Sequence, residues 1–138
     1  ENSRLDEIQA AVLSVKLERL DADNNRRRQI AAMYNAGIKN KAIILPKLHQ
    51  KEEHVWHIYS VRVYNRNAFI AYLNSCGIET VIHYPTAPHR QLAYSEYAHL
   101  VLPITEKIHA EIVSLPISPL LTDAQVQYVI EKVNEWCE

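Results

Sequence analysis

Glycine is nearly absent from this chain, and its scarcity excludes several classes of enzyme. The 138 residues include only Gly37 and Gly77, whereas average usage near 7% would give about ten. A dinucleotide-binding fingerprint needs three glycines within six residues, and a phosphate-binding P-loop needs two that bracket the phosphate cradle. The GxSxG turn of many hydrolases also needs two glycines close together. None of these motifs can be formed with the glycines that are present.

The chain also has few cysteines, almost no net charge and no long apolar run. Cys76 and Cys137 lie far apart without CxxC spacing, which indicates reduced thiols of a cytoplasmic protein. A net charge of −1 provides no basic field for a nucleic-acid partner. No apolar run approaches the ~20 residues of a membrane span, and no export leader is expected. With 48% hydrophobic and 22% charged residues, the composition is that of an ordinary globular domain.

The first 36 residues predict a long helix that reaches beyond its own domain. No glycine or proline interrupts residues 1–36; Asn2 or Ser3 would cap the start, and Gly37 would end the helix. Its apolar face consists of four residues at helical spacing: Leu5, Ile8, Val12 and Val15. A continuous helix of this length would measure about 50 Å. Asn24-Asn25 is the alternative position for a break, since asparagine is a poor helix former.

The remaining residues, 37–138, predict an α+β fold. Strands are expected over 42–45, 55–64 and 78–82, a brief extended piece over 115–117, and helices after Asn65, Pro103 and Thr122. Thr122 and Gln125 have the spacing of a capping box, ahead of an apolar stripe made of Val126, Val129, Ile130 and Val133. The pattern favours a small antiparallel sheet covered by helices. We therefore expect a single unit over residues 1–138.

Five stretches of the chain, in this order and spacing, resemble one protein family. They are NSRLDEIQAAVL (2–13), RRRQIAAMY (26–34), GIETVIHYP (77–85), LPITEKI (102–108) and SLPISPLLT (114–122). Together they resemble the C-terminal part of the DegT/DnrJ/StrS sugar aminotransferases, over essentially the whole chain. The resemblance implies the small domain of an aspartate-aminotransferase (fold type I) architecture, introduced by the interdomain helix over 1–36. The large domain that binds pyridoxal phosphate would lie before Glu1.

The resemblance also implies an activity for the parent protein. Members of this family use pyridoxal phosphate to aminate nucleotide-linked keto-sugars, with glutamate as the expected amino donor. Their products serve cell-surface polysaccharide or deoxyamino-sugar biosynthesis. The fragment itself would contribute homodimer contacts through its first helix and loops that face the ligand. An exposed apolar face on that helix would favour association.

A few residues receive roles from the resemblance. Asn2 and Arg4 would reach the phosphate of the cofactor in the partner subunit, and a helix N-terminus is itself favourable for an anion. His83 and Tyr84, on a loop that prolines keep extended, would lie close to the partner subunit's active site. There they would face the nucleotide sugar through groups suited to hydroxyl and phosphate oxygens. His89 is a weaker candidate for the same role. The alternatives are a simple helix cap at Asn2, a solvated Arg4, and packing roles for His83 and Tyr84.

No catalytic or metal-binding residue is predicted. A lysine that holds pyridoxal phosphate needs a depressed pKa, and none of the chain's lysines matches the family's cofactor motif: Lys16, Lys39, Lys41, Lys47, Lys51, Lys107 and Lys132. We therefore expect no tightly bound cofactor in this fragment. His49, His54 and His57 suggest zinc, but the last two are three apart in a strand-like segment and would point to opposite faces.

Two hypotheses of function follow from the sequence. In the first, the chain is the small domain of a sugar aminotransferase and is inactive by itself. In the second, it is a non-catalytic, stand-alone α+β module for binding or interaction. A lysine motif upstream in the same gene would separate them.

Overall fold

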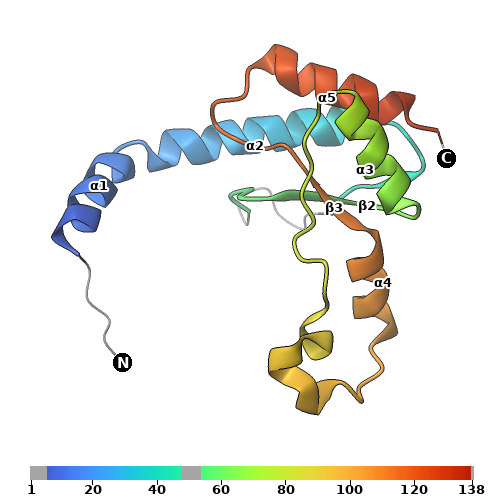
Figure 1. The fold of residues 1–138 in the computed structure, drawn as a ribbon. Helices are drawn as coiled ribbons and strands as arrows, with labels where there is room; N and C mark the ends of the chain where they lie inside the picture. Colours follow the sequence, from blue (N-terminus) through green and yellow to red (C-terminus); the bar gives the residue numbers. More distant parts are fainter. Residues whose placement is uncertain (1–5, 48–53, 138) are drawn as a thin grey trace.

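A computed structural model describes residues 6–47 and 54–137, and it has the expected α+β organisation (Figure 1). The helices are α1 (Glu7–Leu17), α2 (Leu20–Gly37), α3 (Arg66–Ser75), α4 (Pro103–Glu111) and α5 (Asp123–Glu135), with short 3-10 helices η2 (Pro88–Arg90) and η3 (Leu92–Tyr97). The strands β1 (Ile43–Ile44), β2 (Tyr59–Val63) and β3 (Ile112–Leu115) form one antiparallel sheet in the order β1-β2-β3.

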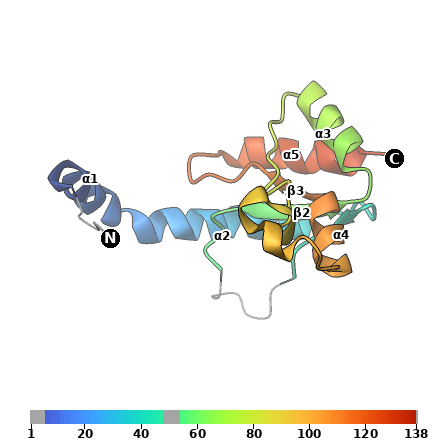
Figure 2. The same cartoon turned by 60° about the horizontal axis from the view of Figure 1, so that its bottom comes forward.

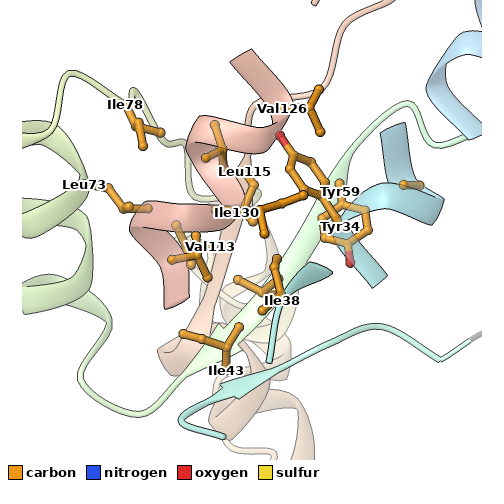
Figure 3. Close-up of a cluster of buried hydrophobic side chains, with 14 of the residues drawn as sticks. Tyr34, Ile38, Ile43, Tyr59, Leu73, Ile78, Val113, Leu115, Val126 and Ile130 are labelled. Carbon is orange, nitrogen blue, oxygen red and sulfur yellow. The ribbon is translucent and has the colours of Figure 1, made fainter. Parts of the chain in front are cut away.

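One face of the sheet forms the hydrophobic core with the helices above it. Alternate residues of β2 are buried because successive side chains of a strand point to opposite faces. Helices α2, α3 and α5 lie on this side of the sheet (Figure 1), and α4 lies on the other. The close-up in Figure 3 shows Tyr34 from α2, Tyr59 from β2 and Ile130 from α5 meeting in this core. The rings of Tyr34 and Tyr59 are 4.9 Å apart, and burial raises the pKa of both phenols.

The last helix forms as the sequence predicts. The Thr122 side chain accepts a hydrogen bond from the Gln125 backbone N–H, and the Gln125 side chain accepts one from the Thr122 N–H. This reciprocal pair satisfies two of the free N–H groups at the start of α5. The predicted apolar stripe is buried in full: Val126, Val129, Ile130 and Val133. Both predictions for α5 are therefore confirmed.

The predicted continuous first helix is wrong, because the chain breaks at Glu18-Arg19 and forms α1 and α2 separately. Asn24-Asn25, the alternative break, lies inside α2. Helix α2 packs its C-terminal half into the core, whereas α1 has no buried residue and extends away from the rest of the chain in both views (Figures 1 and 2). Asp6 caps α1 by accepting the Ile8 N–H at 2.9 Å. The predicted caps Asn2 and Ser3 lie outside the described residues.

The strand predicted over 78–82 is also wrong. Gly77, at φ +73°, ends α3, and the Ile78 N–H donates to the Leu73 carbonyl at 2.9 Å in a Schellman-type cap. The chain then makes a single bridge from Val81 to Ser114. The residue types favour a strand here, but the helix cap at Ile78 and the bridge at Val81 take the place of a continuous ladder. The extended piece expected over 115–117 begins at the last residue of β3, and Pro116 has no N–H to extend the ladder further.

Candidate functional site

The site is built on the sheet face that does not pack against the core. Ser60 of β2 and Ser114 of β3 are directly paired, so their side chains point to the same side of the sheet. Their hydroxyl oxygens lie 3.0 Å apart. Arg62, also on this face, holds the buried Glu111 carboxylate at 2.6 Å. This face is therefore polar, in contrast to the apolar face that the helices cover.

The backbone bridge places His83 over this polar face. The Ser114 N–H donates to the Val81 carbonyl at 2.8 Å, and the Val81 N–H donates back at 3.4 Å. Two residues further on, His83 Nδ1 lies 2.9 Å from Ser114 Oγ. His83 is half-buried and Ser114 is buried. The imidazole is thus held at one nitrogen by a side chain of β3.

Tyr84 is the exposed neighbour of this histidine. Its side chain is 65% exposed, and its ring meets that of His83 edge-on with centroids 5.7 Å apart. Its carbonyl accepts a hydrogen bond from Nδ1 of His109 on α4 at 2.7 Å. The backbone of Tyr84 is therefore anchored to α4, while its phenol faces outward.

A pocket of about 370 Å³ opens beside His83 and Tyr84. Its other lining residues are Pro46, His54, Trp56, His57, Ile58 and Ser60. A smaller pocket of about 180 Å³ adjoins it, with His57, His83 and Ser114 among its lining residues. Sequence reasoning missed Ser60 and Ser114. The alternation of β2 places Ser60 on a polar face, but the register that pairs it with Ser114 cannot be seen in the sequence.

His89 lies elsewhere and is not among the residues that line these two pockets. Its side chain is 5% exposed, and Nε2 lies 3.0 Å from a Glu106 carboxylate oxygen that also accepts from Arg90. The hydrogen bonds from His89, from Arg90 and from the Leu102 N–H lower the pKa of Glu106 from 4.5 to about 2. This cluster joins η2 to the start of α4. The suggested role of His89 toward a ligand stays a prediction.

The described residues do not provide a lysine suited to hold pyridoxal phosphate. Five of the described lysines are exposed: Lys16, Lys39, Lys41, Lys47 and Lys107. Lys132 has a raised pKa because Glu135 and Glu131 accept hydrogen bonds from it. A Schiff-base lysine needs the opposite shift. Asn2, Arg4 and Lys51 lie outside the described residues, so the roles suggested for Asn2 and Arg4 stay predictions.

Two further findings concern the part of the chain that the structure describes. It contains no group of three or more histidine, cysteine, aspartate or glutamate side chains placed to hold a metal ion. His49, one of the three histidines considered for zinc, lies outside that part. None of the described helices combines the length and apolar character needed to cross a membrane.

Comparison with known proteins gives consistent matches. Residues 1–134 match the DegT/DnrJ/EryC1/StrS aminotransferase family. A dTDP-3-amino-3,6-dideoxy-alpha-D-galactopyranose transaminase from Aneurinibacillus thermoaerophilus is 54% identical over 135 residues, which cover 98% of this chain and 37% of that protein. The crystal structure of DesV from S. venezuelae, in complex with a ketimine intermediate, has a TM-score of 0.92 at 40% identity, over 98% of this chain and 37% of that one.

A third match carries a cofactor. The crystal structure of NtdA from Bacillus subtilis with bound PMP has a TM-score of 0.86 at 31% identity, and the match covers 96% of this chain and 32% of that one. The chain thus spans about a third of the length of these proteins. The fold expected from the sequence, a small α+β unit of fold type I aminotransferases, is confirmed. The match over residues 1–134 shows that this chain belongs to the DegT/DnrJ/EryC1/StrS aminotransferase family.

Proposed function

We propose that this chain supplies the small C-terminal domain of a pyridoxal-phosphate enzyme that transfers an amino group, with glutamate as donor, to a nucleotide-linked keto-sugar. One observation carries the proposal: polar side chains from residues 54–57, from β2 and from the 83–84 loop converge on a pocket of about 370 Å³. Family membership supports the reaction class, and the dTDP-sugar transaminase at 54% identity favours a nucleotide sugar as substrate. Two free thiols, Cys76 and Cys137, favour a cytoplasmic location.

In this proposal, His83 and Tyr84 contact the sugar or phosphate oxygens of the substrate that is bound in the neighbouring subunit's active site. An imidazole and a phenol can each donate a hydrogen bond to such oxygens, and the anchored backbone of the loop holds both rings in place. When bound, pyridoxal phosphate supplies an electron sink for amino transfer. Its Schiff-base lysine would lie outside these 138 residues, and Asn2 and Arg4 would reach its phosphate from the neighbouring subunit.

Helix α1 is proposed to form dimer contacts. It has two apolar sides, one with Ile8, Val12 and Val15 and the other with Leu13 and Leu17, and all five side chains are at least half exposed. A helix that is apolar on opposite sides is normally buried between two surfaces. An isolated helix of 11 residues is also marginal in water. We propose that the partner subunit covers one side and the large domain covers the other.

The test uses the whole protein and separates its two half-reactions. His83→Ala is expected to raise KM for the nucleotide-linked keto-sugar about tenfold, the equivalent of one lost hydrogen bond of roughly 1.5 kcal/mol. The glutamate half-reaction, followed by cofactor absorbance, should keep its rate. His99→Ala is the matched control. His99 is exposed, and within the described part of the chain its side chain makes one hydrogen bond, from Nδ1 to the Glu96 carbonyl. Absence of any amino transfer by the whole protein would favour the non-catalytic module instead.

A further inference from the structure

The loop over residues 82–86, between the bridge to β3 and the short helix η2, has little backbone hydrogen bonding of its own. Among the described residues, it forms no backbone–backbone hydrogen bond. Two side chains reach its carbonyl groups. Nδ1 of His109 lies 2.7 Å from the Tyr84 carbonyl oxygen, and the Gln91 amide lies 3.5 Å from that of Thr86, a distance at which a hydrogen bond is weak. In the described part of the chain, His109 therefore makes the one short hydrogen bond to the backbone of this loop.

The acceptor determines the direction of the bond between His109 and Tyr84. A backbone carbonyl accepts hydrogen bonds and cannot donate them, so His109 Nδ1 must carry a proton. In the neutral imidazole this is the only ring proton, and Nε2 has none. In the charged imidazole both nitrogens carry protons, and Nδ1 still donates. The bond is therefore compatible with both charge states of His109 but with only one of its two neutral tautomers.

His109 is itself held in place by the core of the domain. It is half-buried in the last turn of α4, and its own carbonyl accepts a hydrogen bond from Nη1 of Arg66, at the start of α3. Two residues further on, the buried Glu111 carboxylate accepts two hydrogen bonds from Arg62 of β2, at 2.6 and 3.0 Å. These contacts fasten the end of α4 to α3 and to the sheet. His109 is thus a fixed point from which the loop is held.

We propose that His109 is a positioning residue that presents His83 and Tyr84 to the substrate. Ser114 holds the imidazole of His83, and His109 holds the backbone one residue later. Tyr84 is 65% exposed, so few contacts hold its side chain, and the position of its phenol depends on its backbone. The identity of the substrate rests on the function proposed above; the fastening of the loop by His109 does not.

Two substitutions of His109 separate this role from a general effect on α4. In His109→Asn the amide nitrogen is bonded to Cγ, as Nδ1 is, so a donor remains at the same place along the side chain. His109→Leu gives a side chain of nearly the same shape as asparagine but without a donor. Leucine is the better helix former of the two, so an effect on helix stability alone would favour His109→Leu. The positioning role predicts the opposite order.

The matched controls are the same two substitutions at Lys107. This residue is also on α4 and is 67% exposed, and its ion pair, at 3.9 Å, is with Glu111 of the same helix. Neither Lys107→Asn nor Lys107→Leu removes a contact between α4 and the loop. Both variants should therefore behave as the unmodified protein does in every measurement below.

The first measurements use the whole protein and need no substrate. With ¹⁵N-labelled histidine and tyrosine, NMR signals of His109 are identified by their loss in His109→Leu, and the Tyr84 amide by its loss in Tyr84→Phe. At a pH where His109 is neutral, we expect its proton on Nδ1; a proton on Nε2 alone would overturn the proposal. The order parameter of the Tyr84 amide should fall below the ~0.85 of rigid backbone in His109→Leu and stay there in His109→Asn. An unchanged value in His109→Leu would also overturn the proposal.

The kinetic measurement tests what the fastened loop does for the substrate. We expect His109→Leu to raise KM for the nucleotide-linked keto-sugar about fivefold, the equivalent of roughly 1 kcal/mol. His109→Asn should keep KM, and both variants should keep the rate of the glutamate half-reaction. A looser loop with an unchanged KM would overturn the presentation to substrate, and with it the substrate role proposed for His83 and Tyr84. Equal increases of KM in His109→Leu and His109→Asn would show a general effect on α4 and overturn the role of His109.

Discussion

Replacing the two valines of α1 by aspartate should abolish dimer formation without destabilising the chain's own core. Val12 is 50% exposed and Val15 is 68% exposed, so at least half of each side chain remains to be buried when the dimer forms. Covering the remainder contributes about 1 kcal/mol for each valine in each subunit. A symmetric dimer carries the double substitution twice, so it loses about 4 kcal/mol, which corresponds to roughly 1,000-fold weaker association. Desolvation of the new carboxylates would add to this loss.

The assay is sedimentation equilibrium of Val12→Asp/Val15→Asp, together with thermal unfolding followed by circular dichroism. Gln9→Asp is the matched control: it introduces the same carboxylate in the same helix, at an exposed polar position between the two apolar sides. The control should associate as the unmodified chain does. Because α1 has no buried residue, none of these substitutions should lower the unfolding temperature of the monomer. A double variant that still dimerises normally, or a monomer that unfolds at a clearly lower temperature, would refute the reasoning.

Three further predictions concern stability. Gly77→Ala should lower the free energy of unfolding by about 1–2 kcal/mol in urea denaturation, because the backbone lies in the left-handed region at φ +73°. No atom lies within 4 Å of the added Cβ, so the loss comes from the backbone and not from a clash. Asparagine tolerates this region better than alanine, so an equally large loss in Gly77→Asn would contradict the stated cause. Glu106 has its pKa lowered from 4.5 to about 2, so its contribution is present above pH 4.5 and is lost as the pH falls toward 2. Glu106→Gln should therefore reduce the fall in the free energy of unfolding between pH 4.5 and pH 2. If this fall is the same in the variant, the lowered pKa of Glu106 is contradicted. Tyr34 and Tyr59 have raised pKa values, so stability should fall above pH 10, and their ionisation, followed by ultraviolet absorbance, should coincide with unfolding rather than precede it.

The elements that local chemistry determines could be predicted from the sequence. The capping box before α5 and its buried stripe follow from residues three and four apart. The end of α3 at Gly77 follows from the left-handed backbone that glycine tolerates. These features depend on contacts within a single turn or two. They can therefore be predicted without knowing what lies elsewhere in the chain.

Features that depend on tertiary contacts could not be predicted in this way. The break at Glu18-Arg19 carries no proline or glycine; it separates a helix packed in the core from one without buried residues. The residues over 78–82 have strand composition, yet only Val81 pairs with β3. The pairing of Ser60 with Ser114 joins positions 54 residues apart, and no local pattern specifies that register. His83 and Tyr84 were proposed from resemblance to the family, whereas the residues that support them came from the structure.

The most direct test of the central claim is a mixing experiment with the whole protein. Subunits that carry His83→Ala are combined with subunits whose cofactor lysine is replaced, under conditions that allow dimers to exchange. If His83 acts in the active site of the neighbouring subunit, each mixed dimer contains one intact site, and amino transfer to the nucleotide-linked keto-sugar should recover at the KM of the unmodified protein. If the mixture shows only the activity of the His83→Ala protein, at its raised KM, His83 does not reach the neighbouring site and the proposed role of this chain is contradicted.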